Sequence, residues 1–225
     1  MKKKFILILA VTSFLVGISI FLYPYIQQYL YKMHANEIIS EFNEKYPQDD
    51  LEWLYLLMVK YNKDLYEDRQ GNLVDPFSYS QVDFSLKKFG FDEEIVGYIS
   101  VPKMNIDLPI YLGASEENMR KGAAHLTQTS LLIGRKNTNA VIAAHRGMST
   151  AAMFRDIEKL AVGDDVMITN LFETIRYQVT EMRIIQPTDL DAILIQDGKD
   201  MVTLITCHPY RHNYQRYIVY AERVL

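Results

Sequence analysis

The stretch that decides the fold is Thr203-Leu204-Ile205-Thr206-Cys207-His208-Pro209-Tyr210. Its apolar, β-branched run over residues 201–206 predicts a β-strand. Pro209 cannot donate to a central ladder, so we expect the strand to end at or just after Cys207. Cys207 is the only cysteine in the 225 residues, and a rigid sheet commonly presents reactive groups where a strand ends. A lone cysteine is more often a small buried hydrophobe, so a catalytic role depends on what the rest of the chain supplies.

The composition is that of an ordinary globular protein, with 49% hydrophobic and 23% charged residues. The net charge is −4, and basic residues do not cluster beyond the first few positions. No nucleic-acid partner is therefore expected. A single cysteine also excludes an intramolecular disulfide.

The N-terminus predicts a membrane anchor. Lys2, Lys3 and Lys4 precede residues 5–26, an uncharged run of 22 residues. At about 1.5 Å per residue such a helix crosses the ~30 Å core of a bilayer. The positive charges predict a cytoplasmic N-terminus, and hence a single-pass protein of the cell membrane whose folded domain lies on the extracellular face. A cleaved signal peptide is the alternative, but the run exceeds the usual roughly 7–15 residues and no clear Ala-x-Ala site follows it.

Two helices are expected after the anchor. Apolar spacing indicates one helix from about residue 34 and, after a break at Pro47, a second that extends to about residue 68. Asp49 or Asp50 is the expected N-cap of the second helix. A loop rich in turn formers follows. Within it, Asp75-Pro76-Phe77 can form a stiff arm that carries an anion and an aromatic ring.

From Glu94 onward the pattern changes to short strands. They are expected over 95–101, 106–111, 140–144, 166–169, 174–185, 201–206 and 217–223, with helices at 115–121, capped by Ser115, and at 151–160. Many short strands, few helices and no βαβ alternation predict a mainly β fold, either a closed barrel or a sandwich.

A cysteine nucleophile needs a base or an imidazolium partner. Of the five histidines, His145 is the leading candidate because it ends the predicted strand 140–144 and so occupies a strand end, as Cys207 does. His125 lies between a predicted helix and a loop, and we interpret it as structural. The remaining histidines lie in the membrane-proximal helix and in the turn after the cysteine: His34, His208 and His212.

Arg216 is the candidate donor for the oxyanion that forms on attack at a carbonyl. If the chain returns as a strand from residue 215, Arg216 lies beside Cys207, where its guanidinium can bind the substrate carbonyl oxygen. Arg211, in the intervening loop, is the alternative donor.

Neither a metal nor another cofactor is expected. Cys207, His208 and His212 cluster in the sequence, but adjacent residues of a strand point to opposite faces. The sequence also contains no ligand pair with the spacing that zinc sites use.

Together these residues resemble the sortases, the cysteine transpeptidases of Gram-positive surfaces. Residues 203–207 resemble the family's Thr-Leu-x-Thr-Cys strand, Ala144-His145-Arg146-Gly147 resembles its histidine motif, and Arg216 stands at its arginine spacing. Asp75-Pro76-Phe77 matches the lid motif of class C, the pilin-polymerising branch, which segments 121–130 and 137–141 also resemble. The resemblance covers about residues 70–224.

The resemblance implies an eight-stranded sortase β-barrel that cuts a Leu-Pro-x-Thr-Gly-like sorting signal between Thr and Gly. Cys207 would hold the acyl part as a thioester, His145 would act as the acid and base, and Arg216 would hold the carbonyl. In the lid, Asp75 would lie near Arg216 and Phe77 would cover Cys207. Class C sortases transfer the acyl group to a lysine amine of the next pilin.

The expected organisation is an anchor with cytoplasmic lysines (1–30), a helical membrane-proximal segment (31–68), a lid loop and linker (69–90) and the catalytic barrel (91–225). The alternatives are a sortase that anchors surface proteins to peptidoglycan, an L,D-transpeptidase, whose Ser-His-Gly-Cys-like motif is absent, and a non-catalytic pilus assembly module. Class C often carries a second, C-terminal membrane helix, whereas this sequence ends just after its last predicted strand. The loop 208–215 also departs from the family at His208 and Gln215.

Overall fold

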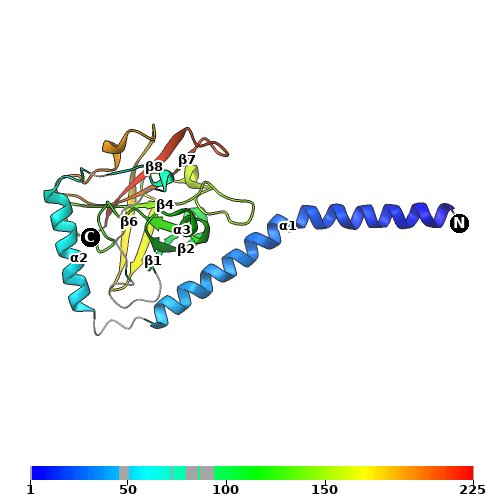
Figure 1. The fold of residues 1–225 in the computed structure, drawn as a ribbon, viewed down its shortest axis with the longest axis horizontal. Coiled ribbons are helices and arrows are strands. Elements are labelled where there is room, and N and C mark those ends of the chain that lie inside the picture. Colours follow the sequence, from blue (N-terminus) through cyan, green and yellow to red (C-terminus); the bar gives the residue numbers. More distant parts are fainter. Residues whose placement is uncertain (1, 46–50, 72, 80–85, 87–93, 225) are drawn as a thin grey trace.

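The computed structural model describes residues 2–45, 51–71, 73–79, 86 and 94–224. Within these residues, eight strands close into a barrel in the order β1-β2-β3-β4-β7-β8-β6-β5 (Figure 1). The strands are β1 (Ile95–Val101), β2 (Ile106–Leu112), β3 (Ala123–His125), β4 (Thr138–Ala143), β5 (Asp165–Asn170), β6 (Thr174–Ile185), β7 (Asp200–His208) and β8 (Gln215–Arg223). The helices are α1 (Lys2–Lys45), α2 (Glu52–Glu67) and α3 (Glu116–Lys121), with 3-10 turns η2 (Pro76–Ser78), η4 (Pro102–Met104), η5 (Ile157–Lys159) and η6 (Leu190–Ile193). The expected mainly β, closed barrel is confirmed.

Strands β4 and β7 are buried on both faces. Ile142 and Leu204 point into the main core inside the barrel, whereas Val141 and Ile205 belong to a second cluster on the other face, which Ile193 of η6 helps to close. Strands covered on both faces are typically continuous apolar runs, which explains the composition of these two segments. They form a rigid centre whose ends carry the predicted site residues.

The pairing of β4 and β7 decides where their ends lie. The two strands are parallel, with Ala143 opposite Ile205, so their carboxyl ends meet at one edge of the barrel. β7 pairs antiparallel with β8, with Cys207 opposite Arg216. The predicted end of the strand just after Cys207 is confirmed, because β7 stops at His208.

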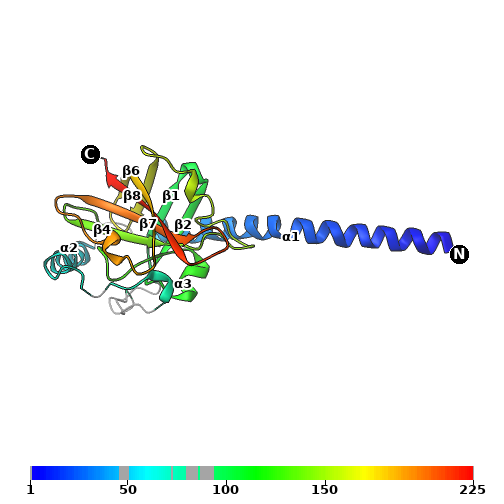
Figure 2. The same ribbon diagram turned by 90° about the horizontal axis from the view of Figure 1, so that it is seen from above.

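Helix α1 is a single element from Lys2 to Lys45, so the helix expected from residue 34 is its continuation. Its first half projects from the barrel and its second half runs alongside the barrel, with a bend between them (Figures 1 and 2). Pro24 inside the helix lacks a backbone N–H and is a usual cause of such a bend. Among the described residues, α1 is the one helix long and apolar enough to cross a membrane, and the rest of the chain buries none of its apolar segment.

Residues 151–160 do not form the predicted α-helix. Their backbone bonds run to the third residue back, as from Arg155 N to Ala152 O and from Leu160 N to Ile157 O. Met153 has φ of 45°, a left-handed conformation that an α-helix excludes. The helical spacing of the apolar residues reflects their burial in the main core, which a chain of tight turns satisfies equally well.

Three details of individual elements bear on the sequence predictions. Strand β3 was not predicted, because its sequence Ala-Ala-His has no β-branched residue; it forms by pairing with both β2 and β4. Helix α2 begins after Leu51, which supplies no side-chain cap; the expected caps, Asp49 and Asp50, lie outside the described residues. The Ser115 cap of α3 is confirmed, since its Oγ accepts a bond from Asn118 N at 3.1 Å.

Candidate active site

His145 and Cys207 each lie two residues beyond the last paired position of β4 and β7, so the register places them at the same edge of the barrel. Beyond the paired residues the two chains stay bonded. Ala144 N donates to Ile205 O at 3.2 Å, and Thr206 Oγ1 donates to Ala144 O at 2.7 Å. The ends of β4 and β7 are therefore held side by side up to the residues just before His145 and Cys207.

Arg216 faces Cys207 across the β7–β8 pair. Its Nη1 donates to Cys207 Sγ at 3.9 Å and to the carbonyl oxygens of Asn213 and Gln215 at 2.7 and 2.9 Å. These carbonyl bonds fix the guanidinium beside the sulfur. Arg211, the alternative donor, instead lies over the ring of Tyr210 in the loop after β7.

The Asp75-Pro76-Phe77 arm occupies this site. Arg216 donates from Nε and Nη2 to the two carboxylate oxygens of Asp75, at 2.8 and 2.7 Å. The ring of Phe77 lies 4.8 Å from the Arg216 guanidinium carbon and 6.3 Å from the His145 ring. Pro76 is buried and starts the turn η2. The arm thus contacts two of the three predicted catalytic side chains.

Two glutamines hold the stem of this arm. Gln70 donates to Gln128 O at 3.3 Å and accepts from Ile195 N at 2.7 Å. Gln128 Oε1 in turn accepts from Val74 N at 3.2 Å. No pattern in the sequence predicts these contacts, because a glutamine in a turn-rich loop cannot be told apart as an anchor or a solvated side chain. The rest of the lid and linker expected over 69–90 lies in part outside the described residues.

Burial dominates the electrostatics of the closed site. It raises the pKa of the Cys207 thiol, against the lowering effect of Arg216, while Asp75 raises that pKa further. Burial also lowers the pKa of His145, with Arg120 of α3 acting in the same direction and Glu116 opposing it. Both shifts favour a neutral thiol and a neutral imidazole while the arm is in place.

The other histidines have different surroundings. His125 is fully buried on β3, with Nε2 2.8 Å from Ser130 O. The ring of His208 lies 5.8 Å from that of Tyr217, and His212 lies against Tyr214. His34 is exposed on α1. In the part of the chain that the structure describes, no group of three or more His, Cys, Asp or Glu side chains could hold a metal ion.

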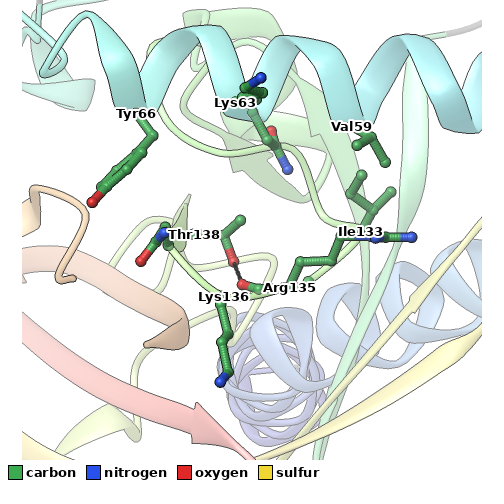
Figure 3. A pocket seen from close by; sticks show the side chains of 10 residues that line it. Val59, Lys63, Tyr66, Ile133, Arg135, Lys136 and Thr138 are labelled. Atoms are coloured by element: carbon green, nitrogen blue, oxygen red, sulfur yellow. Dashed lines mark hydrogen bonds between the residues drawn. The ribbon is translucent and has the colours of Figure 1, made fainter. Parts of the chain in front are cut away.

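Figure 3 shows a cavity of about 140 Å³ between α2 and the loop before β4. Lys63 and Tyr66 reach it from α2, and Arg135 and Lys136 from the loop. Thr138, at the start of β4, donates to Arg135 O at 2.6 Å. Because β4 begins here and ends near His145, this cavity lies at the opposite end of the barrel strands from Cys207.

Comparison with known proteins gives a consistent result. A sequence model of the sortase domain matches residues 99–224. Sortase A of Bacillus anthracis is 28% identical over 161 residues, which cover 71% of this chain and 75% of that protein. Sortase A of Staphylococcus aureus is 26% identical over 216 residues, which cover 93% and 91%.

Solved structures are similar over most of the chain. Sortase C1 of GBS pilus island 1 superposes with a TM-score of 0.77 at 33% identity, covering 85% of this chain and 92% of that one. Sortase C of Streptococcus pneumoniae, whose structure is described as bearing on catalysis and pilin substrate specificity, has a TM-score of 0.69 at 33% identity and covers 84% and 97%.

Proposed function

The chain belongs to the sortase family of cysteine transpeptidases, and from that premise we propose that it polymerises pilins. It would cleave an LPxTG-like sorting signal between Thr and Gly and join the new carboxyl end to a lysine amine of another pilin subunit. The observation that supports this most is the Asp75-Pro76-Phe77 arm, which occupies the site that His145, Cys207 and Arg216 form. The similarity to sortases C of pilus systems points the same way.

The reaction begins when the arm leaves. Loss of Asp75 removes a negative charge near Cys207, entry of water reduces the burial of the thiol, and both changes favour the thiolate. As the thiolate forms, the thiol proton passes to His145. The Cys207 sulfur attacks the threonine carbonyl carbon, and Arg216, freed from Asp75, stabilises the oxygen that gains charge. The Thr–Gly C–N bond then breaks as His145 gives its proton to the leaving glycine amine.

The second half of the reaction reverses these roles. A lysine amine of the acceptor pilin attacks the thioester carbon and loses a proton to His145. The C–S bond breaks, a new amide C–N bond forms, and Cys207 is released. The acyl group thus passes to the acceptor lysine, and the lysine proton taken by His145 restores the Cys207 thiol, without an external oxidant or cofactor.

Helix α1 supports a proposal about the location of the protein. We propose that residues 1–30 hold the chain in the cell membrane, with the lysines in the cytoplasm, and that residues 31–68 place the barrel (91–225) on the extracellular face. There the barrel meets pilin substrates and the lid region (69–90) controls entry. Anchoring of surface proteins to peptidoglycan is the second candidate, because the curated relatives include proteins named sortase A.

The test uses the full chain in detergent micelles, a sorting-signal peptide and a lysine-containing pilin peptide. We expect Cys207→Ala to lose at least about a thousandfold in transfer, and wild type to show a thioacyl adduct on Cys207 by mass spectrometry. His145→Ala should also be inactive, whereas His34→Ala, an exposed histidine of α1, should behave as wild type. Polymerisation of pilin by Cys207→Ala would refute the enzyme assignment, and transfer only to peptidoglycan stem peptides would favour the second candidate.

A further inference from the structure

We propose that Arg146 is a positioning residue that aligns the Cys207 strand end with His145. The inference rests on the proposed function, because it concerns the same two side chains. Arg146 directly follows His145 in the chain, and its Nη1 donates to the backbone carbonyl oxygen of Cys207 at 3.3 Å. One residue therefore joins the backbone next to the proposed base to the backbone of the proposed nucleophile.

The contact between Arg146 and Cys207 O extends the pairing of β4 with β7 through a side-chain hydrogen bond. The backbone ladder ends with the bond from Ala144 N to Ile205 O. From there the links are made by side chains, first by Thr206 Oγ1 to Ala144 O and then by Arg146 to Cys207 O. Strand ends beyond a backbone ladder can twist apart. The bond from Arg146 to Cys207 O joins the two strand ends next to His145 and Cys207, so it acts on the distance between the imidazole and the sulfur.

Arg146 is itself held from two further elements. Its Nη2 pairs with Glu158 of η5 at 2.7 Å, and its guanidinium lies 5.6 Å from the ring centre of Tyr217 on β8. Nη1 also lies 3.2 Å from Nδ1 of His208, so that nitrogen accepts the bond when it carries no proton. The planar fork can reach all these partners at once, which a lysine ammonium cannot.

Burying the charged Arg146 side chain costs folding free energy, which packing alone would not require. The Arg146 side chain is 5% exposed, and a buried cation is tolerated only when paired. Its Nε has no hydrogen-bond partner among the described residues, and an unpaired buried N–H is destabilising. An apolar residue of similar size would avoid that cost, so packing alone does not account for an arginine at this position.

The experiment compares Arg146→Met, Arg146→Lys and wild type as full chains in detergent micelles with a sorting-signal peptide. We expect Arg146→Met to lower kcat roughly 10-fold to 100-fold with KM nearly unchanged, because a small misplacement of reacting groups slows the chemical step. Arg146→Lys keeps the charge and one bond and should recover part of the loss. Lys159→Met, which removes an exposed cation of η5 paired with Asp156, should behave as wild type.

Alkylation of Cys207 by iodoacetamide gives a second readout that needs no peptide. In a chain with the arm disabled by Asp75→Ala and Phe77→Ala, Arg146→Met should slow alkylation several-fold at neutral pH, since the Arg146 cation favours the thiolate. A wild-type kcat for Arg146→Met, or a lower Tm with an unchanged kcat and alkylation rate, would overturn the inference. A wild-type chain that transfers no peptide would instead count against the proposed function, and the alkylation comparison would still decide the role of Arg146.

Discussion

At the scale of single residues, the proposed mechanism gives Arg216 two successive partners. In this structure its two-pronged pairing with Asp75 is largely buried, with 6% and 17% of the two side chains exposed. Breaking such a pair leaves an uncompensated charge unless a new partner arrives. In the proposed mechanism a substrate carbonyl oxygen takes the place of Asp75 and supplies that partner, so the closed arm and the bound substrate would exclude each other.

The first residue-scale prediction concerns the reactivity of Cys207. Asp75→Ala with Phe77→Ala should raise the rate of thiol alkylation at pH 7 by roughly tenfold, because reactivity follows the thiolate fraction and access. The sign follows from the causes: burial and Asp75 both raise the pKa of Cys207, and both are removed. The rate is measured with iodoacetamide over a range of pH.

Asp75→Asn separates the two effects. It keeps the size of the arm residue but removes the charge, so it should give an intermediate rate. Glu67→Ala, a change of an exposed carboxylate on α2, serves as the control and should leave alkylation unchanged. Equal rates in wild type and the double variant would mean that the arm does not restrict the thiol.

At the scale of elements, the sequence predicts those parts of the fold whose local pattern and tertiary surroundings agree. The run 201–206 is apolar because β7 is buried on both faces, so it was recognisable, and His145 and Arg216 followed from strand ends. The prediction of an α-helix over residues 151–160 is wrong because the burial of apolar side chains alone can produce a helix-like spacing. The contacts of Arg146 with Cys207 and of Gln70 with Gln128 join segments distant in the chain, and no local pattern encodes them.

The buried His125 of strand β3 leads to a prediction about how the free energy of unfolding depends on pH. Burial lowers the pKa of His125 to about 4, whereas an unfolded histidine titrates near ~6.5. The unfolded chain therefore binds more protons between these two values, and the native state should lose about 3 kcal/mol as the pH falls from roughly 6.5 to 4. Urea unfolding of the full chain in micelles at several pH values measures this slope.

His125→Phe is the informative variant, because it removes the titrating group from the barrel. The free energy of unfolding of this variant should depend less on pH over the same interval, even if the larger ring lowers that free energy at every pH. The matched control is His34→Phe on the exposed surface of α1, which should keep the wild-type slope. Identical slopes for His125→Phe and wild type would place the pH dependence elsewhere.

At the scale of the whole molecule, α1 is docked on the barrel and does not act as a loose tether. Tyr31 donates its hydroxyl to Lys121 O at 2.9 Å, and the ring of Phe42 meets that of Tyr98 edge-on at 6.3 Å. Gln28 also donates to Ser149 O, in the loop that follows His145, at 3.4 Å. The boundary proposed at residue 30 lies inside this helix, so it separates two functions of one continuous element.

The proposed orientation places the barrel outside the cell, and the lone cysteine allows that orientation to be measured. In intact cells, a membrane-impermeant maleimide should label Cys207 in the Asp75→Ala, Phe77→Ala variant, because the proposed orientation keeps the positive N-terminus in the cytoplasm and the barrel outside. A cysteine introduced by Lys2→Cys in a Cys207→Ala chain should react only after the cells are permeabilised. Labelling of Lys2→Cys in intact cells, with Cys207 protected until permeabilisation, would reverse the proposed orientation and separate the barrel from the proposed pilin substrates.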